Sequence, residues 1–130
     1  MEKNTMLFLT PKNQVIYLTD NMTIRQGLEK MMAHSYSAIP IISEIDGTYK
    51  GVVTEGDFLR ELLKKDHNYK RNVMEIVGKK VLAAKVDTDF EELLEMIVNQ
   101  NFVPIVDDRD IMMGIITRKS IINALKSELN

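Results

Sequence analysis

The chain has 130 residues, no cysteine and a formal net charge of −2, with 45% hydrophobic and 28% charged residues. This composition is typical of a globular protein, and the lack of cysteine excludes disulfides and thiolate metal sites. The small negative charge offers no basic stripe for nucleic acid. Since no apolar segment approaches the length of a membrane helix or a signal-peptide core, we expect a cytoplasmic protein that binds neither nucleic acid nor membrane.

The first half of the chain alternates between strand-like and helix-like patterns. Val15–Leu18 is a short apolar run that predicts a strand. The T-x-x-Q spacing at Thr23 is that of a capping box, so a helix should begin there. Ala38–Ile42 and Lys50–Val53 predict two further strands, and the proline inside the first of them predicts an edge or an irregularity. Thr54 then opens a second helix, with Phe58, Leu59, Leu62 and Leu63 on its apolar side.

The second half repeats the same order after a polar joint. The joint covers residues 66–80, and Val73–Ile76 within it predicts one short helical turn. A strand is expected at Val81–Lys85 and a helix start at Thr88, whose spacing to Glu91 repeats that of the first capping box. The matching anchors are Thr23 with Thr88, Pro40 with Pro104, Gly51 with Gly114, and Thr54 with Thr117.

These patterns define a fold class and its boundaries. The chain is predicted to be α/β, of the α+β type, with two β-α-β-β-α repeats packed about a pseudo-twofold axis. Repeat 1 covers residues 6–65 and repeat 2 covers residues 81–127, on either side of the joint. Neither repeat is long enough to bury both faces of its sheet alone, so clefts between the repeats are expected to bind ligands.

The motif T-x-x-D at Thr54 and Asp57 allows two interpretations. A helix start attracts phosphate, and a carboxylate accepts hydrogen bonds from both hydroxyls of a cis-diol. The same spacing also makes a capping box that needs no ligand. In repeat 2 the position of the aspartate is held by Ser120, while Arg118 and Lys119 could face an anion or form a solvated basic surface.

The repeated pattern resembles a tandem cystathionine-β-synthase (CBS) domain pair, also called a Bateman module. The resemblance rests on LEKMMAHSYSAIPIISEIDGTYKGVVTEGDF and its echo LLEMIVNQNFVPIVDDRDIMMGIITRKSI. The resemblance leads us to expect a protein like the small standalone CBS-pair proteins of bacteria, without an attached catalytic domain.

The resemblance implies a site for an adenine-containing ligand between the repeats. It implies that Asp57 holds the ribose and that Thr54 faces the phosphate. Arg118 and Lys119 follow the matching threonine of repeat 2 and are assigned to phosphate as well. The positions expected to line the adenine are Tyr36, Ser37, Ile39 and Pro40. No residue is assigned to catalysis or to a metal.

The resemblance also implies a function. We expect a non-enzymatic regulatory module that needs no cofactor, binds an AMP-, ADP- or ATP-type nucleotide and acts on a partner protein or through its own homodimer. The alternatives are a ligand-free dimerisation module and a sensor of cyclic di-AMP or S-adenosylmethionine. Helix faces around Leu59, Leu62, Ile122 and Leu125 are expected to supply the dimer interface.

Overall fold

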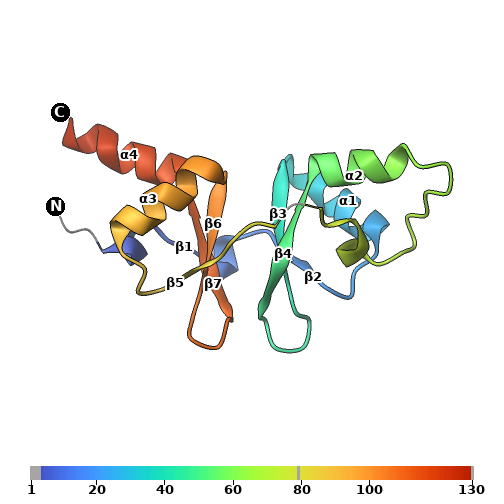
Figure 1. Ribbon diagram of the computed structural model, residues 1–130, viewed down its shortest axis with the longest axis horizontal. Helices are drawn as coiled ribbons and strands as arrows, with labels where there is room; N and C mark the ends of the chain where they lie inside the picture. Colours follow the sequence, from blue (N-terminus) through green and yellow to red (C-terminus); the bar gives the residue numbers. More distant parts are fainter. Residues whose placement is uncertain (1–3, 79, 130) are drawn as a thin grey trace. The chain divides into compact units, whose positions relative to one another are not determined.

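The computed structural model describes residues 4–78 and 80–129, which form helices and two small sheets (Figure 1). The elements of the first half are η1 (Thr5–Phe8), β1 (Thr10–Pro11), η2 (Lys12–Gln14), β2 (Leu18–Thr19), α1 (Ile24–His34), β3 (Ala38–Ile42), β4 (Tyr49–Thr54) and α2 (Glu55–Leu62). Those of the second half are η3 (Val73–Ile76), β5 (Ala84–Lys85), α3 (Phe90–Asn99), β6 (Phe102–Val106), β7 (Met112–Thr117) and α4 (Arg118–Glu128). The β-α-β-β-α order is confirmed in both repeats.

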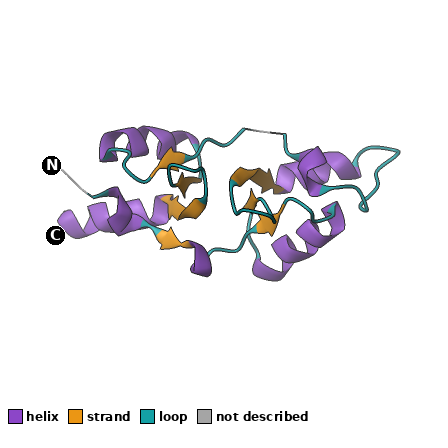
Figure 2. Cartoon of the chain, turned by 90° about the horizontal axis from the view of Figure 1, so that it is seen from below, coloured by secondary structure: helices purple, strands orange, loops and turns teal. Residues whose placement is uncertain are grey.

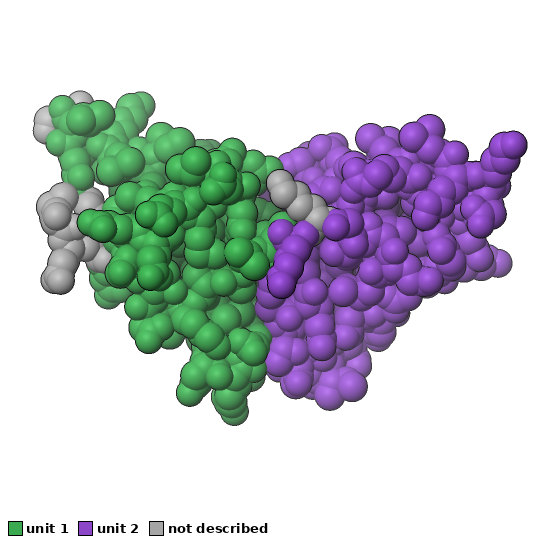
Figure 3. Space-filling view, in the orientation of Figure 1, with its two compact units in different colours: residues 1–15, 81–130 green, residues 16–80 purple. Residues whose placement is uncertain are grey.

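The chain forms two compact units, whose boundaries do not coincide with those of the two repeats (Figure 3). Unit 2 covers residues 16–80, so the joint packs with the first repeat. Unit 1 combines residues 81–130 with the N-terminal residues 1–15. The N-terminal segment reaches repeat 2 through antiparallel pairing of β1 with β7 and through a hydrogen bond of 2.8 Å from the Thr5 hydroxyl to the Thr88 carbonyl.

The sheet of unit 2 has the strand order β2-β3-β4. β3 runs antiparallel to β4 and parallel to β2, which pairs only with Ile41 and Ile42. Pairing with β2 therefore starts only after Pro40, which suits a residue that has no N–H to donate to a second neighbour. The ladder with β4 is irregular between Ile41 and Ile42, one residue beyond the proline where an irregularity was predicted.

Unit 1 repeats this arrangement and adds one strand, in the order β1-β7-β6-β5. Its central ladder is also irregular, between Ile105 and Val106. The two helices of each unit lie on one face of that unit's sheet (Figures 1 and 2). Each unit has its own core, and η3 contributes Val73 and Ile76 to that of unit 2.

The helix starts follow the sequence at three of four places. Thr23, Thr54 and Thr117 each accept a hydrogen bond from the third residue of the following helix. The prediction for Thr88 was wrong by one residue, because Asp89 caps α3 and accepts from the Glu92 amide at 2.9 Å. A carboxylate is a strong N-cap group, so the aspartate fixes the first turn.

The expected boundaries of the two short strands were wrong, and the apolar side of α2 is only partly buried. Pairing of β2 begins at Leu18 rather than Val15, and that of β5 at Ala84 rather than Val81. On α2 only Phe58 of the four apolar residues is buried, while Leu59, Leu62 and Leu63 are exposed. A helix buries one stripe of residues, so an apolar surface wider than that stripe stays in solvent.

Candidate functional site: the start of α2 and the joint

The carboxylate of Asp57 is buried at the first turn of α2 and accepts three hydrogen bonds. Its Oδ2 accepts from the Thr54 amide at 2.8 Å, and the Thr54 hydroxyl accepts from the Asp57 amide at 3.2 Å. Its Oδ1 accepts from the Gly78 amide at 3.2 Å and from the Arg60 guanidinium. The capping box therefore forms, and one oxygen of the same carboxylate holds the joint.

Two glycines make room for the Arg60 side chain over this carboxylate. A Cβ atom on Gly56 would lie 3.2 Å from Arg60 Nη1, and one on Gly78 would lie 3.1 Å from Arg60 Nη2 and 3.0 Å from Asp57 Oδ1. The Arg60 side chain is 63% exposed, whereas that of Asp57 is 0% exposed. The guanidinium is thus the solvent-facing donor on an otherwise enclosed carboxylate.

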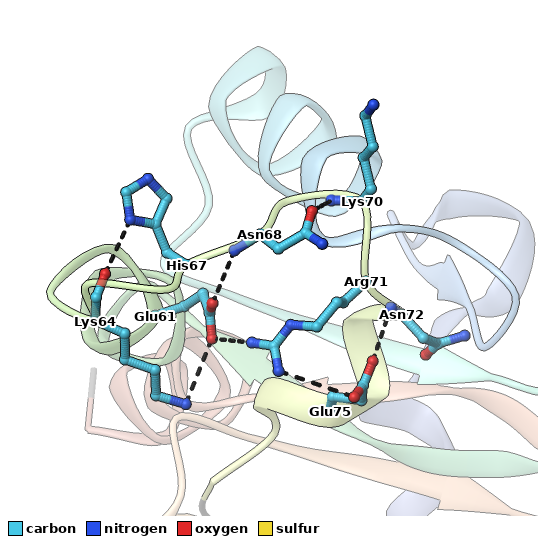
Figure 4. Close-up of polar contacts among 8 residues, drawn as sticks. All are labelled: Glu61, Lys64, His67, Asn68, Lys70, Arg71, Asn72 and Glu75. Carbon is cyan, nitrogen blue, oxygen red and sulfur yellow. Dashed lines mark hydrogen bonds and ion pairs between the residues drawn. The ribbon is translucent and has the colours of Figure 1, made fainter.

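One turn further along α2, Glu61 forms a second buried anchor for the joint (Figure 4). Its carboxylate accepts from the Arg71 guanidinium and from the Asn68 amide at 3.3 Å, and Lys64 Nζ lies 3.5 Å away. Burial by itself would raise the pKa of Glu61, but hydrogen bonds from Arg71 and Asn68 and the charges of Arg71 and Lys64 hold it below the ordinary value. Glu61 therefore remains a carboxylate inside a folded contact.

The corresponding turn of α4 has no carboxylate. The Thr117 hydroxyl accepts from the Ser120 amide at 3.1 Å, and the Ser120 hydroxyl donates to the Thr117 carbonyl at 2.8 Å. Ala124 stands where α2 has Glu61, given the offset between Thr54 and Thr117. The start of α4 is capped by its threonine hydroxyl as in α2, but it has no reciprocal capping-box bond and binds no other described segment through an acidic side chain.

Arg118 and Lys119 differ in what they contact. The Arg118 guanidinium donates to the carbonyls of Ile97 and Val98, both at 2.8 Å, and to Asn101 Oδ1 at 3.1 Å. It closes the C-terminal end of α3, where cations favour the helix dipole. Lys119 is exposed at the start of α4.

A pocket of about 380 Å³ lies on unit 2 between the end of α1 and the start of α2. Tyr36 and Ser37 line it together with Glu55 and Leu59, but Asp57 does not. Residues 55 and 59 lie about 200° around the helix from residue 57, because successive residues are about 100° apart. Two of the residues assigned to adenine therefore face one side of α2, and the residue assigned to ribose faces the other.

The other two positions assigned to adenine lie in the sheet. Ile39 and Pro40 are buried in β3 and pair with Val53 and Val52 of β4. Because β2 pairs only with Ile41 and Ile42, no described strand pairs with the other edge of β3 at Ile39 and Pro40. The structure therefore places Ile39 and Pro40 on a strand edge that β2 does not cover.

Sequence reasoning missed Arg60, Glu61 and Gly78 as members of this site. Arg60 and Glu61 follow Asp57 at helical spacings of three and four residues, which is a signal for side-chain contact. Nothing in the sequence places Gly78 near Asp57, which is 21 residues away. Within residues 4–78 and 80–129 there is no group of three potential metal ligands and no helix long and apolar enough to cross a membrane.

Comparison with known proteins identifies the two repeats. The sequence model of the CBS domain matches residues 9–64 and again residues 73–127. The inosine-5'-monophosphate dehydrogenase of Methanocaldococcus jannaschii is 29% identical over 114 residues, covering 86% of this chain and 22% of the dehydrogenase. The chain spans about half or less of the length of the curated relatives it matches.

Solved structures share the fold over nearly the whole chain. CbpB, solved in complex with cyclic di-AMP, has a TM-score of 0.86 at 23% identity and covers 98% of this chain and 87% of its own. CBSX2, solved in complex with AMP, has a TM-score of 0.79 at 21% identity, with 95% and 96% covered. At these identities the similarity establishes the fold.

Proposed function

Because the chain belongs to the CBS domain family and carries two copies of the domain, we propose that it is a non-enzymatic regulatory module that binds an adenine nucleotide. The observation that carries the proposal is the Asp57 carboxylate, which accepts from an exposed guanidinium beside a helix start. The hydroxyls of a ribose can donate hydrogen bonds to the same carboxylate, and the α2 start favours a phosphate. CbpB and CBSX2, which have this fold, were solved with cyclic di-AMP and AMP.

Each assigned residue keeps a distinct role in this proposal. Asp57 receives the ribose hydroxyls on Oδ1, while Oδ2 stays on the Thr54 amide and keeps the helix capped. Thr54 and the first turn of α2 face the phosphate. The free edge of β3 at Ile39 and Pro40 meets the adenine, and Tyr36 and Ser37 adjoin it across the start of α2.

The matching start of α4 is proposed to bind an anion without a ribose. Ser120 has one hydroxyl, and that hydroxyl already donates to the Thr117 carbonyl. Lys119 is an exposed cation there. Arg118 adds positive charge while its guanidinium stays on the end of α3. We expect this start to contribute charge to phosphate binding rather than a second diol contact.

The test is direct titration calorimetry, supported by thermal shift, with AMP, ATP, cyclic di-AMP and S-adenosylmethionine. A ligand that binds the native state raises its stability by RT ln(1 + [L]/Kd). Asp57→Ala should abolish the heat of binding. Asp89→Ala is the matched control, because it also removes a helix cap carboxylate but lies on α3. Binding that survives Asp57→Ala would contradict the ribose assignment.

A ligand-free structural module is the second candidate, and a specific observation favours it. Asp57 and Glu61 already have a structural use, since both hold the joint against α2. This function predicts no heat with any of the four ligands, together with a loss of stability in Asp57→Ala that is independent of ligand.

We also propose that the chain forms a homodimer through the outer faces of α2 and α4. Leu59 and Ile122 are each 60% exposed at matching positions of the two helices. Glu55 and Arg118 also occupy matching positions and carry opposite charges. If the α2 face of one copy meets the α4 face of the other, opposite charges meet, whereas pairing like faces brings like charges together.

Engineered thiols distinguish these arrangements, because the natural chain has no cysteine. We expect a dimer in light scattering. A mixture of Leu59→Cys and Ile122→Cys chains should form disulfide-linked pairs, while either variant alone should not. Cross-linking of Leu59→Cys with itself would overturn the crossed pairing, and a monomer in light scattering would overturn the dimer.

A further inference from the structure

Arg60 is the one donor on the Asp57 carboxylate that can leave without unfolding anything described. The other two donors are backbone amides, of Thr54 in the helix cap and of Gly78 in the joint. Arg60 reaches Asp57 from one turn later on the exposed side of α2, and most of its side chain is in solvent. Only the guanidinium of this pair lies in solvent, so a ligand that donates to the same carboxylate oxygen can replace it while Asp57 keeps its two backbone donors.

The place that Arg60 occupies is also where the phosphate of a bound nucleotide is proposed to lie. Its Nη1 passes so close to Gly56, the second residue of α2, that an added Cβ would lie 3.2 Å away and 3.7 Å from the Thr54 hydroxyl. The guanidinium therefore spans the short distance between the carboxylate and the helix start.

A nucleoside and a nucleotide would meet this guanidinium differently. A nucleoside brings two hydroxyls, which replace the arginine on Asp57 and leave the arginine without an anion. A nucleotide brings the same hydroxyls and a phosphate, to which a guanidinium binds through two parallel hydrogen bonds. Only the nucleotide provides a new anionic partner for the Arg60 guanidinium in place of the Asp57 carboxylate.

We propose that Arg60 selects for phosphorylated ligands: it occupies the Asp57 carboxylate in the free protein and transfers to the phosphate of the nucleotide when Asp57 receives the ribose. The proposal rests on the nucleotide-binding function proposed above and adds a residue to it. Binding at the Asp57 carboxylate would thereby depend on both the ribose hydroxyls and the phosphate of the ligand.

The experiment compares affinity for adenosine with affinity for whichever of AMP, ATP and cyclic di-AMP binds the wild-type protein most tightly. Calorimetry is done on the full chain at one fixed ionic strength. Arg60→Met removes the charge and keeps a long side chain, and Arg60→Lys keeps the charge but loses the two-pronged donor. Arg25→Met is the control, because Arg25 is also exposed and pairs with Glu29 at 3.0 Å, but on α1.

Arg60→Met should weaken nucleotide binding about tenfold or more, as expected for loss of a charged hydrogen bond, and should strengthen adenosine binding. The ratio of the two affinities should therefore collapse. Arg60→Lys should give an intermediate ratio, and it carries the test if the methionine variant does not fold. Arg25→Met should leave the ratio unchanged.

Two negative results have different meanings. If the wild-type protein binds a nucleotide and the ratio is the same in both Arg60 variants, the selection by Arg60 is wrong and the nucleotide-binding function stands. If neither the wild-type protein nor the Arg60 variants bind any of the three nucleotides, both proposals are overturned. If an Arg60 variant binds adenosine or a nucleotide that the wild-type protein does not, Arg60 blocks the carboxylate but does not serve the phosphate.

Discussion

α2 and α4 both begin with a threonine cap, but only α2 completes a capping box, and the two helices differ in what they bind afterwards. In α2 two buried carboxylates one turn apart, Asp57 and Glu61, hold the joint that follows the helix. In α4 the matching residues are Ser120 and Ala124, and α4 is the last described element of the chain. The two acidic residues of repeat 1 bind the segment that follows α2, which is a structural use for Asp57 that Ser120 does not have.

Neutralising Glu61 should have the largest effect on the difference between α2 and α4. Glu61→Gln removes the buried carboxylate that Arg71 binds, in a site where Arg71 Nε already has no partner among the described residues. Breaking a buried ion pair from one side is strongly destabilising, so we expect the largest fall in melting temperature of any change considered for α2. Circular dichroism during heating measures it.

Glu75→Gln is the matched control for this variant. The Glu75 carboxylate also faces Arg71, but at 3.9 Å and with half of its side chain exposed. It should change the melting temperature little. Equal falls for the two substitutions would show that the buried position of Glu61 gives it no special weight.

Acid should also weaken the contact that α2 makes through Glu61, which has no counterpart in α4. The pKa of Glu61 lies below its ordinary value of 4.5, so the folded state favours the charged form. This stabilisation is complete above the unfolded pKa and is lost as pH falls through the folded one. The free energy of unfolding should therefore fall below about pH 4.5, and in Glu61→Gln it should fall less. Urea titrations at a series of pH values check this, and parallel curves would contradict it.

Removing the side chain at the third position of each helix should give unequal losses. Asp57→Ala removes the acceptor for two backbone amides and one guanidinium, and we expect it to cost about 2 kcal/mol. Ser120→Ala removes only local hydroxyl contacts with Thr117 and should cost less than about 0.5 kcal/mol. Urea denaturation of both variants at pH 7 measures the difference. Similar losses would mean that the joint gains nothing from Asp57.

The smallest expected effect comes from giving α4 the residue of α2. Ser120→Asp places a carboxylate opposite the Thr117 amide in the first turn, where it can complete a capping box and favour the helix dipole. We expect a gain of about 0.5 kcal/mol in the free energy of unfolding. A larger gain would mean that the new carboxylate finds partners beyond the helix start.

Much of the fold could be predicted because its signals are local. The capping boxes at Thr23 and Thr54, the strand Ala38–Ile42 and the turn Val73–Ile76 all appear in the structure as the sequence indicated. Each depends on residues within a few positions of one another. The short strands β2 and β5 were misplaced because two paired residues leave almost no periodic pattern to read.

The candidate site could be predicted only in part for the same reason. The sequence allowed Thr54 and Asp57 to be either a cap or a ligand site, and the cap is formed. Whether Asp57 also holds a ribose remains a prediction. Arg60 and Gly78 decide how accessible the Asp57 carboxylate is. Arg60 reaches it through the conformation of its side chain, and Gly78 reaches it because the joint folds back onto α2.

The sequence by itself determined the repeat, the order of helices and strands and the family, because these depend on local spacing that occurs twice. Only the tertiary structure decided that the N-terminal segment pairs with β7 while the joint packs on α2. It also decided which apolar residues of α2 are buried and which donors occupy Asp57. These outcomes depend on contacts between distant segments, and no local pattern encodes which distant partner will meet a given donor or acceptor.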